Sequence, residues 1–272
     1  MRLFLIALTA AFAVWLPRAP AESGELPAVR VSPVQTGQAR LSMPPGRYGS
    51  IQHMRTPLPP KAIALTFDDG PSPQYNSRVL DILDARGIKA TFFFVGQYVQ
   101  AHPEQVREVV RRGHNVASHS WSHPTYLRHW TQEAQVNEVR RSYAALESAL
   151  ADAPPEERAR LEPMFRFPGL GEGPYLADWL NRRGILVVSA EAGTDDWRGY
   201  SAESVARISL NAMESHQGGV LILHETRPQM IRALPALLDE LSARGFTFVQ
   251  ITAGPDGRQK ALAAEDAVLT LR

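Results

Sequence analysis

The sequence contains no cysteine. This absence excludes a disulfide framework and thiolate metal ligands, so a metal ion would have to be held by histidines and carboxylates. An excess of one charge is also lacking, because the formal net charge is +1. Such a balance gives no support for a nucleic acid or an anionic membrane as the partner.

The N-terminal apolar run, Leu3–Leu16, is shorter than the roughly 20 residues that a membrane-spanning helix needs. It follows Arg2 and precedes Ala19-Pro20-Ala21, an A-x-A-like cleavage site, so residues 1–21 are predicted to be a signal peptide. Cleavage at a nearby position and a retained anchor are the alternatives, and membrane contact is expected only through this segment if it is uncleaved. The missing cysteine excludes a lipid-modified N-terminus. We therefore expect the protein outside the cytoplasm, either periplasmic or secreted.

A chain of 272 residues with 44% hydrophobic content can build one sizeable core. Residues 22–60 are rich in proline and show no sustained apolar period, which predicts an extended linker. Residues 61–252 are predicted to form a single catalytic domain, and residues 253–272 a C-terminal tail. We expect a monomer.

Within residues 61–252, short apolar runs alternate with amphipathic segments. The predicted strands are Ala62–Phe67, Ala90–Val95, Asn115–Ser118, Phe165–Phe167, Ile185–Ser189, Val220–Leu223 and Thr247–Ile251. The predicted helices are Ser77–Arg86, Glu104–Arg112, Glu133–Leu150, Tyr175–Arg183, Ala202–Ser215 and Ile231–Arg244. Residues 151–162, with two prolines and mixed charge, are expected to be a solvated surface loop. Alternating strands and helices predict a parallel sheet, and about seven repeats favour a distorted, irregular (β/α) barrel over an open sheet.

Two short segments carry chemistry. Thr66-Phe67-Asp68-Asp69-Gly70 places two carboxylates at the end of an apolar strand, where Gly70-Pro71 predicts a turn. His119-Ser120-Trp121-Ser122-His123 spaces two imidazoles closely enough for both to hold one ion. One carboxylate and two histidines make an open metal site, with positions left for water and substrate. The second carboxylate would then be free to act as a base.

These segments resemble the first two motifs of the polysaccharide deacetylase family, also called the NodB homology domain or carbohydrate esterase family 4. Arg166-Phe167-Pro168-Gly169 resembles the third motif, Asp196-Trp197 the fourth and Ile222-Leu223-His224 the fifth. All five occur in the family's order across residues 61–250. The resemblance implies the same distorted (β/α) barrel, with its site at the carboxyl ends of the strands. Asp68, Asp69, His119, Arg166 and His224 each lie at or just past the end of a predicted strand, as catalytic residues of such barrels do.

The resemblance also implies a role for each residue of the site. The expected metal ligands are Asp69, His119 and His123. The expected catalytic residues are Asp68 as the base, Arg166 as its partner, His224 as the acid and Asp196 as the group that orients this acid. Zinc suits this ligand set best, although cobalt or nickel fits similar ligands. The remaining histidines, His53, His102, His114, His129 and His216, match no motif and are expected to be solvated.

The chain departs from the family's usual pattern at three positions. Gly169 stands where a tyrosine is frequent, Gly193 where an acidic residue begins the fourth motif, and Glu225 where an aspartate follows the last histidine. Loss of the ring at 169 would change how a sugar is gripped. We predict an exported metal-dependent deacetylase that hydrolyses the N-acetyl groups of an N-acetylhexosamine glycan. The alternatives are a hydrolase of another amide, imide or O-acetyl ester on the same fold, and an inactive glycan-binding protein.

Overall fold

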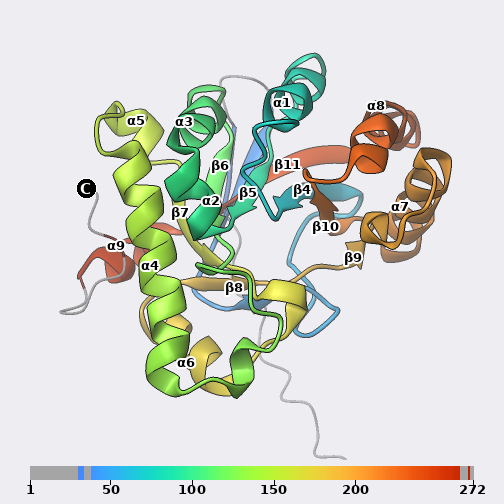
Figure 1. Ribbon diagram of the computed structural model, residues 1–272. Coiled ribbons are helices and arrows are strands. Elements are labelled where there is room, and N and C mark those ends of the chain that lie inside the picture. The colour runs from blue at the N-terminus through green and yellow to red at the C-terminus, as the bar shows by residue number, and fades with distance from the viewer. Residues whose placement is uncertain (1–29, 34–37, 264–268, 270–272) are drawn as a thin grey trace, which may run out of the picture.

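The computed structural model describes residues 30–33, 38–263 and 269. A parallel sheet forms its centre and curls into a half-barrel, with helices on its outer side (Figure 1). The seven strands of the parallel core are β4 Ala62–Asp68, β5 Thr91–Phe94, β6 Asn115–Ser118, β7 Leu161–Phe165, β8 Leu186–Val188, β10 Gly219–His224 and β11 Thr247–Ala253. The predicted irregular (β/α) barrel of about seven parallel strands is confirmed.

Strand β4 is the central strand of this sheet. It pairs with β10 from Ile63 to Asp68 on one side, and with β11 and then β5 on the other. From β5 the sheet continues through β6 and β7 to β8. The short strand β9, Ala192–Gly193, follows β8 and pairs with β10, so the sheet bends back toward its start.

The helices that follow these strands cover the outer face of the sheet (Figure 1). They are α1 Asn76–Asp84, α2 Gly96–Ala101, α3 Pro103–Arg111, α4 Gln132–Leu150, α5 Pro155–Arg158, α6 Pro174–Arg182, α7 Ala202–His216, α8 Pro228–Ala243 and α9 Pro255–Ala263. Thr131 and Ser201 cap α4 and α7 by accepting hydrogen bonds from backbone N–H groups of the first turn. The six predicted helices correspond to α1, α3, α4, α6, α7 and α8.

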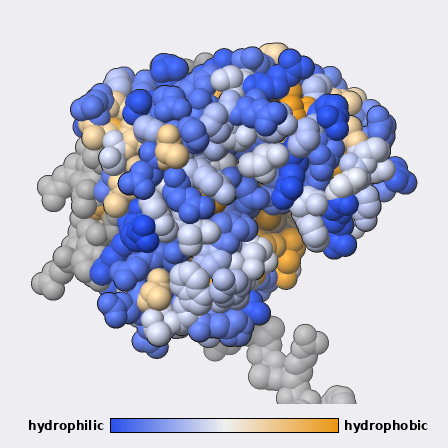
Figure 2. Space-filling model, viewed as in Figure 1, coloured by the Kyte–Doolittle hydropathy of each residue, from blue (hydrophilic) through white to orange (hydrophobic). Residues whose placement is uncertain are grey.

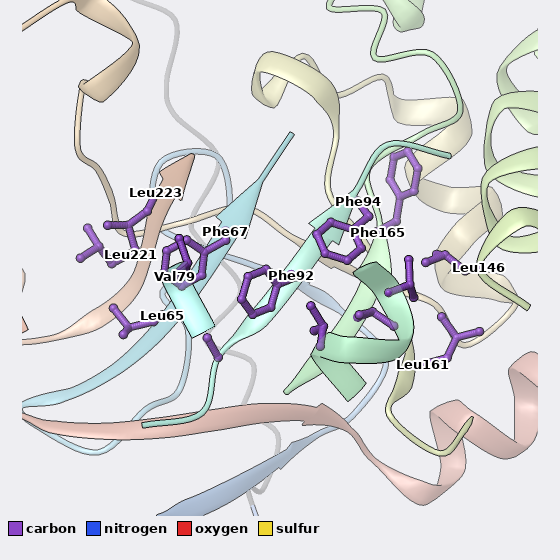
Figure 3. Packing of buried hydrophobic residues seen from close by; sticks show 14 of the residues in the cluster. Leu65, Phe67, Val79, Phe92, Phe94, Leu146, Leu161, Phe165, Leu221 and Leu223 are labelled. Atoms are coloured by element: carbon purple, nitrogen blue, oxygen red, sulfur yellow. The ribbon is translucent and has the colours of Figure 1, made fainter. Parts of the chain in front are cut away.

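Side chains alternate between two hydrophobic layers along each central strand. In β4, Ile63, Leu65 and Phe67 join the layer between the sheet and the helices, together with Phe92 and Leu221 of the neighbouring strands (Figure 3). The intervening residues of β4 point into the barrel, where Ala62 and Ala64 contact the smaller inner layer. Because successive strand residues face opposite sides, this alternation also directs Thr66 and Asp68 inward. The strand therefore carries Asp68 to the inside of the barrel mouth.

The extended linker predicted over residues 22–60 is wrong for the segment around residues 39–48. Ala39–Met43 forms β2, which pairs in parallel with β11, and Arg47–Tyr48 forms β3, which pairs in parallel with β8. Leu41, Met43 and Tyr48 are fully buried in the inner layer. The prolines that suggested a linker flank these short strands, and the burial of alternate residues outweighs their local effect. Strand β1, Arg30–Pro33, pairs antiparallel with β2.

Two further expectations are wrong for the segment before Arg166. The strand predicted at Phe165–Phe167 instead spans Leu161–Phe165, and the surface loop predicted over residues 151–162 ends earlier than expected. Glu162 is buried because it accepts a hydrogen bond from Ala253 N and forms an ion pair with Arg258. A carboxylate with such partners can therefore lie in a buried strand, although its charge alone would disfavour burial.

The predicted signal peptide, residues 1–21, lies outside the described residues. Within residues 30–33 and 38–263, no helix combines the length and apolar character needed to cross a membrane. Of the predicted C-terminal tail, Pro255–Ala263 forms helix α9, which begins next to the end of β11.

Candidate active site

A cleft of about 640 Å³ opens at the carboxyl ends of the parallel strands. Among the residues that line it are Asp68, Asp69, His119, His123 and His224. They come from the end of β4, the loop after β6 and the end of β10. The face of the molecule in Figure 2 is mostly hydrophilic, and hydrophobic residues gather in a recess between the part holding α6 and the part holding α7 and α8. The predicted histidines and carboxylates, distant in sequence, therefore meet in one cleft.

Asp69, His119 and His123 form a compact group of ligand atoms, all within 4.8 Å of one another. The Nε2 atoms of His119 and His123 lie 3.5 and 3.1 Å from the same Asp69 oxygen, Oδ1. Burial alone would raise the pKa of Asp69, but the two imidazoles outweigh this effect and hold it well below its usual range. The group therefore presents an ionised carboxylate beside two ring nitrogens.

The tautomer of His119 is set by a backbone carbonyl. Its Nδ1 lies 2.8 Å from Arg166 O, and since a carbonyl can only accept, Nδ1 carries the proton and donates it. The other ring nitrogen, Nε2, then faces Asp69 and is the atom available to a metal ion. The residue that follows β7 thereby orients a histidine that belongs to the loop after β6.

These three side chains fit a divalent cation. Asp69 Oδ1 is buried and has no hydrogen-bond donor among the described residues, although two imidazole nitrogens point at it. A buried oxygen that lacks a hydrogen-bond donor is satisfied by binding an ion or a water molecule. One carboxylate oxygen and two imidazole nitrogens are also the donor set of open zinc sites.

Glu138 of α4 holds the histidine loop in place, a role that no sequence pattern indicated. Its carboxylate accepts hydrogen bonds from Trp121 N at 3.0 Å, Ser122 N at 2.8 Å and Ser122 Oγ at 3.0 Å. His123 N in turn donates to Ser120 Oγ at 3.0 Å. On a helix surface Glu138 resembles an ordinary solvated charge, and its partners are backbone groups that a sequence pattern does not display.

Asp68 and Arg166 form a buried ion pair beneath the cleft. Arg166 Nη1 donates to Asp68 Oδ1 at 2.6 Å and to Thr66 Oγ1 at 2.8 Å. Its other donors reach the carbonyls of Val188 and Ser189, each at 3.0 Å. Because each nitrogen of the fully buried guanidinium has an acceptor, the guanidinium is held in place and fixes the position of the Asp68 carboxylate.

His224 and Asp196 form a second pair on the other side of the cleft. Asp196 is fully buried and lies in the short 3-10 helix Asp196–Arg198 after β9. Its Oδ1 lies 2.6 Å from His224 Nδ1, and its Oδ2 accepts from His224 N at 2.9 Å. Burial alone would lower the pKa of His224, but the hydrogen bond and charge of Asp196, aided by Asp68 and Asp69, raise it to about 9. The imidazole is therefore held protonated at neutral pH.

Left-handed backbone conformations concentrate in the loops that form the cleft. Non-glycine residues with positive φ are uncommon and cost energy. In the part of the chain that the structure describes, such residues in these loops are Asp69, Ser120, His123, Leu170 and Asp195. Two of the three candidate ligands are thus held in conformations that the surrounding fold must stabilise.

Glu225 supports the site in a way that the sequence did not indicate, and His114 differs from its prediction. Glu225 is fully buried and accepts a hydrogen bond from Ser72 N at 2.6 Å, so it braces the loop that follows Asp69. Burial raises the pKa of Glu225 to about 8. His114 was expected to be solvated, but it is fully buried and its Nδ1 accepts a hydrogen bond from Ala90 N.

Comparison with known proteins agrees with this geometry. Residues 55–184 match the family model described as polysaccharide deacetylase. The chain is 32% identical over 221 residues to a chitooligosaccharide deacetylase of Bradyrhizobium sp. (strain ANU 289), which covers 73% of this chain and 90% of that protein. It is 31% identical over 196 residues to the peptidoglycan-N-acetylglucosamine deacetylase PgdA of Listeria monocytogenes, covering 70% of this chain. The matched part is only 38% of the length of the Listeria protein.

A solved structure gives the same result. The Bdellovibrio bacteriovorus peptidoglycan deacetylase Bd3279 superposes with a TM-score of 0.67 at 25% identity, over 85% of this chain and 61% of that one. The chain belongs to the polysaccharide deacetylase family, so the resemblance noted from its five motifs is confirmed.

Proposed function

We propose that the protein is an exported, metal-dependent polysaccharide deacetylase that hydrolyses N-acetyl groups of an N-acetylhexosamine glycan to acetate and free amine. The observation that carries the proposal is the meeting of three groups in one cleft: the ligand atoms of Asp69, His119 and His123, the Asp68–Arg166 pair, and the His224–Asp196 pair. Amide hydrolysis needs each of them, because water is a poor nucleophile and an amine anion is a poor leaving group.

Asp69, His119 and His123 would hold the divalent cation, for which zinc is the best candidate and cobalt or nickel the alternatives. When bound, such an ion lowers the pKa of a coordinated water and polarises the amide carbonyl. The shared Oδ1 of Asp69 and the fixed tautomer of His119 support this assignment.

Asp68 is the proposed base. It accepts the proton of the attacking water, and its pairing with Arg166 keeps the carboxylate in place as it does so. Asp68 Oδ2 lies 3.8 Å from His119 Nε2, so the carboxylate stands next to the ligand group without being one of its three members.

His224 is the proposed acid. Its protonated ring donates a proton to the amide nitrogen as the C–N bond breaks, which releases a neutral amine. Asp196 keeps this ring charged and fixes its orientation. A dedicated acid is most useful for an N-acetyl substrate, since an ester oxygen leaves more readily, and this favours a deacetylase over an O-acetyl esterase.

The glycan is proposed from the relatives, which are named as deacetylases of peptidoglycan N-acetylglucosamine and of chitooligosaccharides. We propose a substrate of this chemical class and action outside the cytoplasm, as the predicted signal peptide requires. The alternative of an inactive glycan-binding protein is disfavoured because both ion pairs and the three ligand atoms occur together.

The test is acetate release from N-acetylated chitooligosaccharides and from peptidoglycan by the purified protein as isolated, after chelation, and after zinc is restored. The proposal predicts release that chelation abolishes and zinc recovers. Release that is unaffected by thorough chelation would refute the metal dependence. Binding of the glycan without any release under all three conditions would favour the inactive binding protein.

A further inference from the structure

The wall of the cleft includes Ile51, a residue outside the family match that begins at residue 55. Its side chain is 48% exposed although it is large and apolar. The exposed large hydrophobic side chains of the described residues also include Trp197 at 52%, which lines the same cleft. Exposed apolar surface gathered inside a cleft is typical of a ligand-contacting surface.

The loop that carries Ile51, residues 49–54, is held firmly by backbone hydrogen bonds. Gly49 N donates to Met54 O at 3.0 Å and His53 N donates to Gly49 O at 2.8 Å. Ile51 N itself donates to Ala190 O at 3.0 Å. Gly49 has a φ of 108°, and a Cβ there would lie 2.3 Å from Ala190 N, so only glycine fits this close approach.

A buried carboxylate joins this loop to the strand that carries His224. Glu191 Oε1 accepts hydrogen bonds from Ser50 N at 3.1 Å and Thr56 N at 2.8 Å, while its Oε2 accepts from Val220 N at 2.6 Å. Val220 belongs to β10, which ends at His224. The position of Ile51 is therefore fixed relative to the proposed acid.

Two side chains tie the same loop to the segment after β7. Gln52 Nε2 donates to Leu170 O, and His53 Nε2 lies 2.5 Å from Glu172 Oε2. Gly169 in this segment lines the same cleft as Ile51 and Leu170 but contributes no side chain to it. Because these hydrogen bonds already order the loop, little conformational entropy of the loop is lost when a ligand contacts Ile51.

We propose that Ile51 contacts substrate and packs against the apolar face of a sugar ring neighbouring the one that is deacetylated. This inference rests on the proposed function and deepens it, because such a contact makes the enzyme favour an oligomeric glycan over a small acetylated compound. Both N-acetylglucosamine polymers named for the relatives provide repeated pyranose rings with apolar C–H faces, and Ile51 supplies an aliphatic surface for one of them.

The test compares Ile51→Ser with Met54→Ser, a control in the same loop. Met54 is also large, apolar and 44% exposed, but it is not among the residues that line the cleft. With a chitooligosaccharide and saturating zinc, Ile51→Ser should raise KM roughly fivefold, because about half of an isoleucine side chain loses its buried contact. The kcat/KM of Ile51→Ser for a small activated acetyl ester should be unchanged. Met54→Ser should resemble wild type on both substrates, and the KM of Ile51→Leu for the oligosaccharide should return most of the way to the wild-type value.

Binding measured separately keeps this test independent of turnover. Calorimetric titration of the same oligosaccharide into zinc-loaded Asp68→Asn protein, with and without Ile51→Ser, should show the same roughly fivefold difference in Kd. Equal affinity in the two proteins overturns the inference even if the wild-type enzyme releases acetate. Absence of acetate release from wild type, combined with the fivefold difference in Kd, overturns the proposed function and leaves the contact supported. Absence of measurable binding overturns both.

Discussion

The pairing of Asp196 with His224 gives a quantitative prediction for Asp196→Asn. The rise in the pKa of His224 from 6.5 to about 9 corresponds to about 3 kcal/mol in favour of the protonated ring. Asparagine keeps the shape of the side chain but removes its charge, so the pKa of His224 should fall toward its ordinary value or below it. At pH 7.5 the protonated fraction then drops from nearly all to about a tenth, and activity should fall about tenfold.

The assay is the pH profile of kcat/KM for acetate release from a chitooligosaccharide at saturating zinc. The alkaline limb should lie at least two pH units lower in Asp196→Asn than in wild type. A bound cation lowers the pKa of His224 in both proteins, so the difference between the profiles is the tested quantity. Asp195→Asn is the matched control, because Asp195 pairs with Arg198 and its loss should leave the alkaline limb in place. An alkaline limb that does not move in Asp196→Asn would refute the role of His224 as the acid.

Three further changes test separate parts of the account. Arg166→Met should lower the free energy of unfolding, measured by urea denaturation, by about 3–5 kcal/mol because it leaves Asp68 buried and unpaired. A loss below about 1 kcal/mol would contradict this prediction. Burial lowers the pKa of His114 to about 4, so the free energy of unfolding should fall by about 3 kcal/mol as the pH falls from 6.5 to 4. In His114→Gln the free energy of unfolding should depend less on pH, and parallel curves for the variant and wild type would contradict this prediction. His224→Ala should reduce N-deacetylation far more than hydrolysis of an activated acetyl ester in one metal-loaded preparation, and equal losses would mean that His224 has only a structural role.

The repeating strand and helix units could be predicted because each segment carries its own local signal. Strand β4 is an apolar run, interrupted only by Thr66, that ends at two aspartates and a turn, and Ser201 marks the start of α7 at its cap. These signals depend only on neighbouring residues. The predicted barrel is therefore observed although the ends of several elements shift.

The errors arose where distant partners decide the structure. Ala39–Met43 is short and lies between prolines, and its pairing with β11 and β1 makes it a strand. Glu162 looked solvated until its partners, Ala253 N and Arg258, were known. Local propensity is a weak guide when tertiary pairing supplies the stability.

The same reasoning separates the site residues that the sequence indicated from those that it did not. Asp69, His119 and His123 were indicated by residue type and spacing, whereas the structure brings them within reach of one ion. Glu138 and Glu191 were missed because both bind backbone N–H groups far along the chain, and a lone glutamate has no pattern that signals this. Residues that support a site through backbone contacts become visible only once the fold is known.

The central claim is that the three ligands and the base have separate roles, and metal content measured beside acetate release tests it most directly. Wild-type protein is expected to bind one zinc ion and to release acetate. His119→Ala and His123→Ala should lose zinc and activity together, while Asp68→Asn should keep its zinc and lose turnover. If Asp68→Asn protein lost its zinc while His123→Ala protein retained it, the assignment of ligands and base would be contradicted.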